Sequence, residues 1–154
     1  MKKYLTILTF LFSFNAIYSH CQVPCGIYDD AMRIVILQED FKTIKKAMKE
    51  INSLSKMNDG QSLNQLNRWV ATKDQHSTNI QRVVSAYFMT QRVKDKNSHY
   101  TDQLKYLHQI LVYAMKSKQS VDEKNVNNGL KYIEDFSEVY FDEHGLEHLR
   151  KMSE

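Results

Sequence analysis

The sequence predicts an all-α protein whose main body is an up-down-up-down four-helix bundle. Apolar residues recur at steps of three and four through four segments, which is the spacing of one face of a helix. After Gly26 the chain holds only three glycines, Gly60, Gly129 and Gly145, and no proline. No segment alternates apolar and polar residues as a half-buried strand would. Four such helices with short connections favour antiparallel neighbours, and hence the bundle.

The first 19 residues have the pattern of a removable export signal. Two lysines form a positive start, Tyr4 to Phe14 form an apolar stretch, and a polar exit ends at Ser19. The apolar stretch is shorter than the about 20 residues of a membrane span. We therefore expect residues 1–19 to be removed, leaving residues 20–154 as one exported domain, periplasmic or extracellular, with no stable membrane association. An uncleaved anchor and a cut after Ala16 are the alternatives.

The first two helices can be placed from their flanking polar residues. Asp29 or Asp30 is expected to cap the first helix, and Asn58-Asp59-Gly60 to end it. Ser62 with Gln65 matches a capping box for the second helix, which runs to a break at Asp95 to Ser98. The first apolar stripe is Ile34, Leu37, Phe41, Ile44, Met48 and Ile51, and the second is Leu66, Trp69, Lys73, His76, Ile80, Val83 and Tyr87.

The last two helices follow the same logic. The third carries Leu104, Leu107, Ile110, Leu111 and Ala114, and the fourth carries Val126, Leu130, Ile133, Phe136 and Tyr140. Ser120 with Glu123 matches a second capping box. Gly129 inside the fourth helix costs about 1 kcal/mol of helix propensity. Gly145 is expected to end that helix, with residues 146–154 as a short tail.

Charge excludes a nucleic-acid protein. The net charge is +3, and removing the two lysines of the leader lowers it to +1. Acidic and basic residues are interspersed along the chain, so no basic block offers a phosphate-binding surface.

The run His20-Cys21-Gln22-Val23-Pro24-Cys25-Gly26-Ile27-Tyr28 holds both cysteines and the only proline. If the chain is cut after Ser19, His20 has a free α-amine. That amine, the deprotonated amide and thiolate of Cys21, and the thiolate of Cys25 make a planar set of two nitrogens and two sulfurs. The His20 imidazole can add an axial ligand. Such a set suits Ni(II) or Cu(II), whereas zinc prefers a tetrahedron. A Cys21–Cys25 disulfide is the alternative, because exported proteins usually pair their cysteines.

The run H-C-x-x-P-C-G-x-Y after a cleavage point resembles the nickel hook of the nickel-containing superoxide dismutases. Two further segments, Asn67-Arg68-Trp69-Val70 and residues 87–92, also resemble members of this family. The resemblance implies a domain made of a hook over residues 20–28 and a helical bundle over residues 29–154. It implies one nickel per subunit, superoxide as the substrate and a homohexamer in which each hook packs against neighbouring subunits.

The resemblance also implies roles for single residues. His20, Cys21 and Cys25 would be the metal ligands, and Pro24 with Gly26 would shape the hook through a cis Val23–Pro24 bond. The hydroxyl of Tyr28 would stand near the open metal face and hold water or the incoming anion.

Two positions depart from the family pattern. His76 stands in the region from which an arginine of the family supports the axial imidazole, and we name it as a candidate for that support. Gln38 and Glu39 are candidates for its acidic partner, with neither assigned. Gln22 stands where many relatives have Asp, which removes a carboxylate but no metal bond.

His144 and His148, four residues apart, could share a metal on one helix face, but a solvated tail is the commoner arrangement.

Two non-enzymatic functions remain open on the residues alone. One is an exported bundle that carries nickel or copper at the same hook. The other is an interaction bundle with a Cys21–Cys25 disulfide, which predicts no metal and no dependence on the cut before His20.

Overall fold

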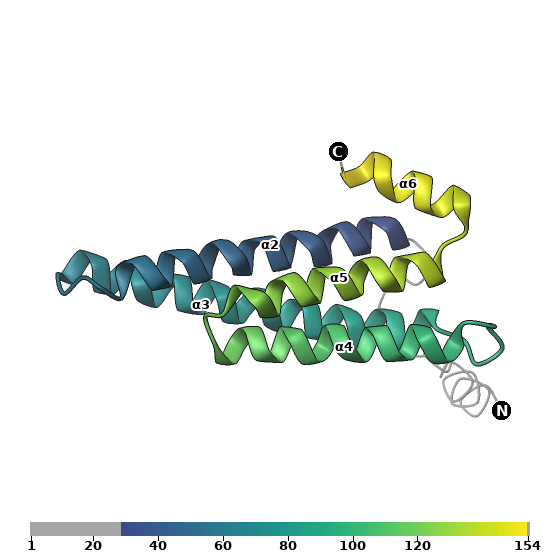
Figure 1. The fold of residues 1–154 in the computed structure, drawn as a ribbon, viewed down its shortest axis with the longest axis horizontal. Coiled ribbons are helices and arrows are strands. Elements are labelled where there is room, and N and C mark those ends of the chain that lie inside the picture. The colour runs from purple at the N-terminus through teal and green to yellow at the C-terminus, as the bar shows by residue number, and fades with distance from the viewer. Residues whose placement is uncertain (1–28, 154) are drawn as a thin grey trace, which may run out of the picture.

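The computed structural model of the chain describes residues 29–153, which are almost entirely helical. Four helical arms pack as a bundle in which each contacts the next: α2 with α3, α3 with α4, α4 with α5, and α5 with α2 (Figure 1). This closed order confirms the up-down-up-down four-helix bundle. The elements are α2 (Asp30–Leu54), α3 (Gly60–Arg82), the π-helix η1 (Val83–Arg92) that continues α3, α4 (Tyr100–Gln119), α5 (Glu123–Tyr140) and α6 (Glu143–Ser153).

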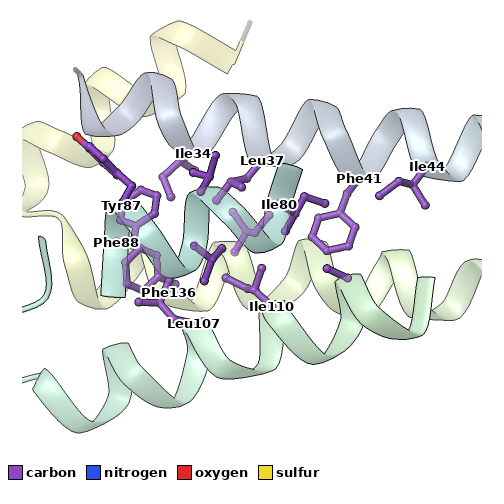
Figure 2. Packing of buried hydrophobic residues seen from close by; sticks show 14 of the residues in the cluster. Ile34, Leu37, Phe41, Ile44, Ile80, Tyr87, Phe88, Leu107, Ile110 and Phe136 are labelled. Atoms are coloured by element: carbon purple, nitrogen blue, oxygen red, sulfur yellow. The ribbon is translucent and has the colours of Figure 1, made fainter. Parts of the chain in front are cut away.

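The predicted apolar stripes form the core. On α2 the whole first stripe is buried, and Figure 2 shows Ile34, Leu37, Phe41 and Ile44 facing the residues of the other arms. The rings of Phe88 and Phe136 meet edge to face with their centroids 5.3 Å apart, which joins η1 to α5. The partly buried stripe residues of the other arms are Leu66, Trp69, His76, Leu104, Leu111, Leu130 and Tyr140.

One of the three capping predictions is confirmed. Asp29 caps α2, and its carboxylate accepts the backbone N–H of Ala31 at 2.8 Å. Ser62 does not cap α3: Asp59 does, and it accepts the backbone N–H of Ser62 at 3.0 Å. Likewise Asp122, and not Ser120, caps α5. In both places an aspartate preceded or followed the serine closely, and its longer side chain reached the free N–H groups.

The C-terminal end of the chain also differs from the prediction. α5 ends at Tyr140, before Gly145, and residues 143–153 form the helix α6 instead of a tail. α6 lies against α2 (Figure 1), and Leu149 is buried there. Leu149 and Met152, three positions apart on one face of α6, pack against the core. This packing stabilises the short helix, which would be marginal in isolation.

The charged residue inside the second stripe has a structural explanation. Lys73 is buried, and its ammonium donates to the carbonyl oxygens of Ser117 at 2.9 Å and Lys118 at 2.6 Å. These carbonyls belong to the last turns of α4, where backbone acceptors lack helical partners and the dipole favours a cation. Lys73 therefore ties α3 to the end of α4.

Among residues 29–153, no helix is both long enough and apolar enough to cross a membrane.

Candidate metal centre

The predicted ligands lie outside the described residues. His20, Cys21 and Cys25 precede Asp29, as do Pro24, Gly26 and Tyr28, so their predicted roles stay predictions. Within residues 29–153, no three His, Cys, Asp or Glu side chains gather closely enough to hold a metal ion. The thiolates of the chain are all in the hook, and their chemistry, two soft sulfurs beside nitrogen donors, fits nickel.

The first turn of α2, directly after the hook, is held by a cluster centred on Asp30. Both tyrosines at this end donate their hydroxyls to its carboxylate, Tyr87 from η1 to Oδ1 and Tyr140 from α5 to Oδ2 at 2.7 Å. Arg92 of η1 adds two more hydrogen bonds to Oδ2, from Nη2 and from Nε at 3.0 Å. The Asp30 side chain is 13% exposed. We call Asp30, Tyr87, Arg92 and Tyr140 the Asp30 clamp.

The π-helix explains how two residues of one element reach the same carboxylate. In an α-helix of 3.6 residues per turn, Tyr87 and Arg92, five residues apart, would point about 140° away from each other. In η1 the bonds run from residue i to i+5, which widens the turn and brings such pairs onto one side. The N–H of Val93 donates to the carbonyl of Phe88 at 2.9 Å, and the side chains of Thr90 and Gln91 also bond to carbonyls five residues earlier.

The Asp30 carboxylate sets the electrostatics of the clamp. Burial and the hydrogen bond to Asp30 raise the pKa of Tyr87 above its usual range, and the same two causes raise the pKa of Tyr140 to about 12. The hydrogen bonds to Asp30 also raise the pKa of Arg92. Both tyrosines are therefore neutral donors at physiological pH. Figure 2 shows the hydroxyl of Tyr87 directed toward the start of α2.

A second contact holds the same turn from the C-terminal side. Nε2 of His148, on α6, lies 2.7 Å from Oδ2 of Asp29. Both side chains are about half exposed. Mainly through this hydrogen bond, the pKa of Asp29 is lowered. His148 thus has a carboxylate partner within its own chain, and the described residues offer the pair His144 and His148 no third metal ligand.

His76, the candidate for supporting the axial imidazole, is paired with a buried acid. Its Nδ1 lies 2.6 Å from Oδ1 of Asp40, and Asn79 donates to Oδ2 at 2.6 Å. Asp40 is buried, whereas the His76 side chain is 35% exposed. The acidic neighbour is therefore Asp40, and neither Gln38 nor Glu39. In the neutral tautomer that donates from Nδ1 to the carboxylate, Nε2 is the acceptor.

Sequence reasoning missed most of the clamp. Tyr87 and Tyr140 were expected in the core and Asp30 as a cap, but their contact needs three separate elements. Arg92 belongs to the segment 87–92 that resembles the family, but its five-residue spacing from Tyr87 matches neither the α-helical nor the strand period, so no pattern predicted their shared contact.

The comparison with known protein families decides the assignment. The sequence model of the nickel-containing superoxide dismutases matches residues 15–144, which include the hook and nearly all of the bundle. The chain belongs to the nickel-containing superoxide dismutases. Searches among curated proteins and among solved structures gave no match.

Membership of this family gives the activity of the protein. It is an oxidoreductase that converts superoxide to oxygen and hydrogen peroxide, and its cofactor is nickel. The metal carrier and the disulfide-bonded bundle, which the residues alone had left open, are therefore not favoured. The clamp fixes the first turn of α2, which begins two positions after Tyr28 in the sequence.

Proposed function

We propose that this dismutase holds nickel in an N-terminal hook that forms only after the leader is removed. The ligands are the α-amine and imidazole of His20, the amide and thiolate of Cys21, and the thiolate of Cys25. The observation that carries the proposal is the match of the family to a region that includes both cysteines and the predicted cleavage point before His20. Square-planar nitrogen and thiolate donors suit nickel by geometry.

In this reaction the chain's own residues hold the metal, bind water or the incoming anion, and shape the turn between the two thiolates. When bound, nickel would supply one-electron redox chemistry to superoxide. The thiolates of Cys21 and Cys25 and the amide of Cys21 would hold it and, being anionic, would stabilise its oxidised state. Two protons are consumed for each hydrogen peroxide formed, and the hydroxyl of Tyr28 is placed by the motif to hold water or the incoming anion. Pro24 and Gly26 shape the turn between the two thiolates.

His76 is proposed as the support of the axial imidazole. The contact with the buried Asp40 orients the His76 ring, and in the neutral tautomer that donates from Nδ1 its Nε2 can accept a hydrogen bond from His20. Asp40 lies ten residues beyond Asp30, about 15 Å along α2. A hook that extends from the first turn of α2 must therefore fold back along the helix, or reach His76 of a neighbouring copy.

Assembly into a hexamer and export through the leader complete the proposal. Three large apolar side chains are exposed near the joined end of α2 and α3: Met57 at 49%, Leu63 at 47% and Val70 at 40%. In Figure 1 the joined end of α2 and α3 extends beyond α4 and α5. Exposed apolar side chains of this kind favour contact with another copy of the chain.

The test compares a chain that begins at His20 with one that carries a single extra alanine before it. The extension converts the amine into a peptide nitrogen and leaves every side chain in place. We expect the first chain to bind one nickel and remove superoxide catalytically, and the second to lose at least 100-fold in activity, by the cost of disturbing a metal ligand. A matched control carries the alanine after Glu154. Full activity of the N-terminally extended chain would contradict the proposed ligand set.

Native mass spectrometry of protein secreted through its own leader tests the remaining parts. A chain that begins at His20, carries nickel and forms a six-fold complex is the expected result. A chain that retains residues 1–19 while active contradicts the cut, and a smaller active complex contradicts the hexamer.

A further inference from the structure

The first turn of α2 is fixed from three directions. η1 supplies Tyr87 and Arg92 to Asp30, α5 supplies Tyr140, and α6 supplies His148 to Asp29. These partners lie between 57 and 119 positions away in the sequence. A capped helix needs only its own Asp29 to satisfy its first N–H groups, so contacts from three more elements exceed what helix formation requires.

The clamp is also costly to build. It gathers a carboxylate, a guanidinium and two phenols at one end of the bundle, where apolar packing would serve stability as well. It depends on a ten-residue π-helix, an element that is rare and that often marks functional sites. The segment that directly precedes this cluster in the sequence is the hook, residues 20–28, so we infer that the cluster serves the hook.

We propose that the Asp30 clamp is a positioning device that fixes where and in which direction the hook leaves the bundle, and thereby raises the affinity of the hook for nickel. The inference rests on the proposed ligand set. Asp30 lies five positions after Cys25, a length that spans at most about 18 Å when fully extended. Because the first turn of α2 is rigid, the hook would lose less conformational entropy when it binds nickel, and its affinity for nickel would be higher.

The clamp residues act through the hook and touch no substrate. The relevant variants are Asp30→Asn, which weakens all the bonds at once, Tyr140→Phe and Arg92→Lys. Tyr140→Phe removes one hydroxyl and keeps the ring that stacks on Phe136 at 5.0 Å. Arg92→Lys keeps the charge but cannot make the forked contact of a guanidinium. Asp102→Asn, an exposed acid in the first turn of α4, is the matched control.

The first measurement is amide hydrogen exchange in the metal-free chain that begins at His20. We expect a peptide covering residues 29–36 to exchange about tenfold faster in Asp30→Asn than in wild type, because the loss of charged hydrogen bonds lets the first turn open. Asp102→Asn should match wild type. Equal exchange in Asp30→Asn and wild type overturns the clamp.

The second measurement is a titration of the same chains with Ni(II), followed by the nickel–thiolate absorption. We expect the dissociation constant to rise about tenfold in Asp30→Asn, and less in Tyr140→Phe and Arg92→Lys, with the absorption band of the loaded protein unchanged. Faster exchange together with unchanged nickel affinity overturns the positioning role.

The two proposals fail in different ways. Wild-type protein that binds no nickel through Cys21 and Cys25 contradicts the proposed ligand set and, with it, the positioning role. Normal loading of wild type with equal affinity in Asp30→Asn contradicts the clamp alone.

Discussion

Gly129 of α5 lies directly against the ring of Phe41 of α2. A β-carbon at position 129 would stand 2.5 Å from Cε1 of Phe41 and 3.0 Å from Cε2, and the ring is fully buried. The glycine that weakens the fourth helix therefore lies where α5 packs tightly against α2. Its cost in helix propensity is offset by this packing.

Replacing Gly129 by alanine should destabilise the protein, although alanine is the better helix former. We expect the free energy of unfolding to fall by about 1–3 kcal/mol, because the buried ring must shift. Chemical denaturation measures this. Asn128→Ala, on the exposed side of the same turn, is the control. Adding Phe41→Leu should restore part of the loss, whereas a more stable Gly129→Ala protein would disprove the close contact.

Asp40 should be needed for stability as well as for orienting His76. Asp40→Ala removes a buried carboxylate and leaves His76 and Asn79 without their partner, so we expect a loss of about 2–3 kcal/mol in the free energy of unfolding. Glu39→Ala, the exposed neighbour, should change it by less than about 0.5 kcal/mol. Denaturant unfolding of the metal-free chains measures the free energy of unfolding of both variants. Equal losses in Asp40→Ala and Glu39→Ala would contradict a special role for Asp40.

Tyr140 should make the protein sensitive to alkali. Its pKa is raised from 10 to about 12, so the folded state holds the phenolic proton more tightly than the unfolded state does. The stability that this bond contributes is complete below pH 10 and is lost as the pH rises to 12. The difference in unfolding free energy between wild type and Tyr140→Phe should therefore shrink over that range. A difference that stays constant from pH 8 to pH 12 would count against the raised pKa.

Asp29 should contribute to stability at neutral pH and lose that contribution in acid. Its pKa is lowered below 3.8, chiefly by the hydrogen bond to His148, so the folded state holds this proton less tightly than the unfolded state. The contribution is present above pH 3.8 and disappears as the pH falls below it. Asp29→Asn keeps a capping side chain without the charge. Denaturant melts at several pH values should show wild type and Asp29→Asn converging in acid, and parallel curves would contradict this.

Much of the bundle could be predicted from the sequence because its signals are local. The stripe from Ile34 to Ile51 needs only the helical period, and the order of four arms needs only short connections. The capping errors at Ser62 and Ser120 arose where two polar residues competed for the same N–H groups. α6 was missed because its helix depends on burying Leu149 against other elements.

Residue types and local periods in the sequence predict the family, its nickel chemistry and the helical class, and the apolar stripes predict most of the core. The packing of the helices was needed to find the partners of Asp30, the acid that contacts His76, and the ring that lies against Gly129. Asp30 meets Tyr140 across 110 positions, and Asp40 meets His76 across 36. Contacts between such distant residues depend on how whole helices pack, and no local period records them.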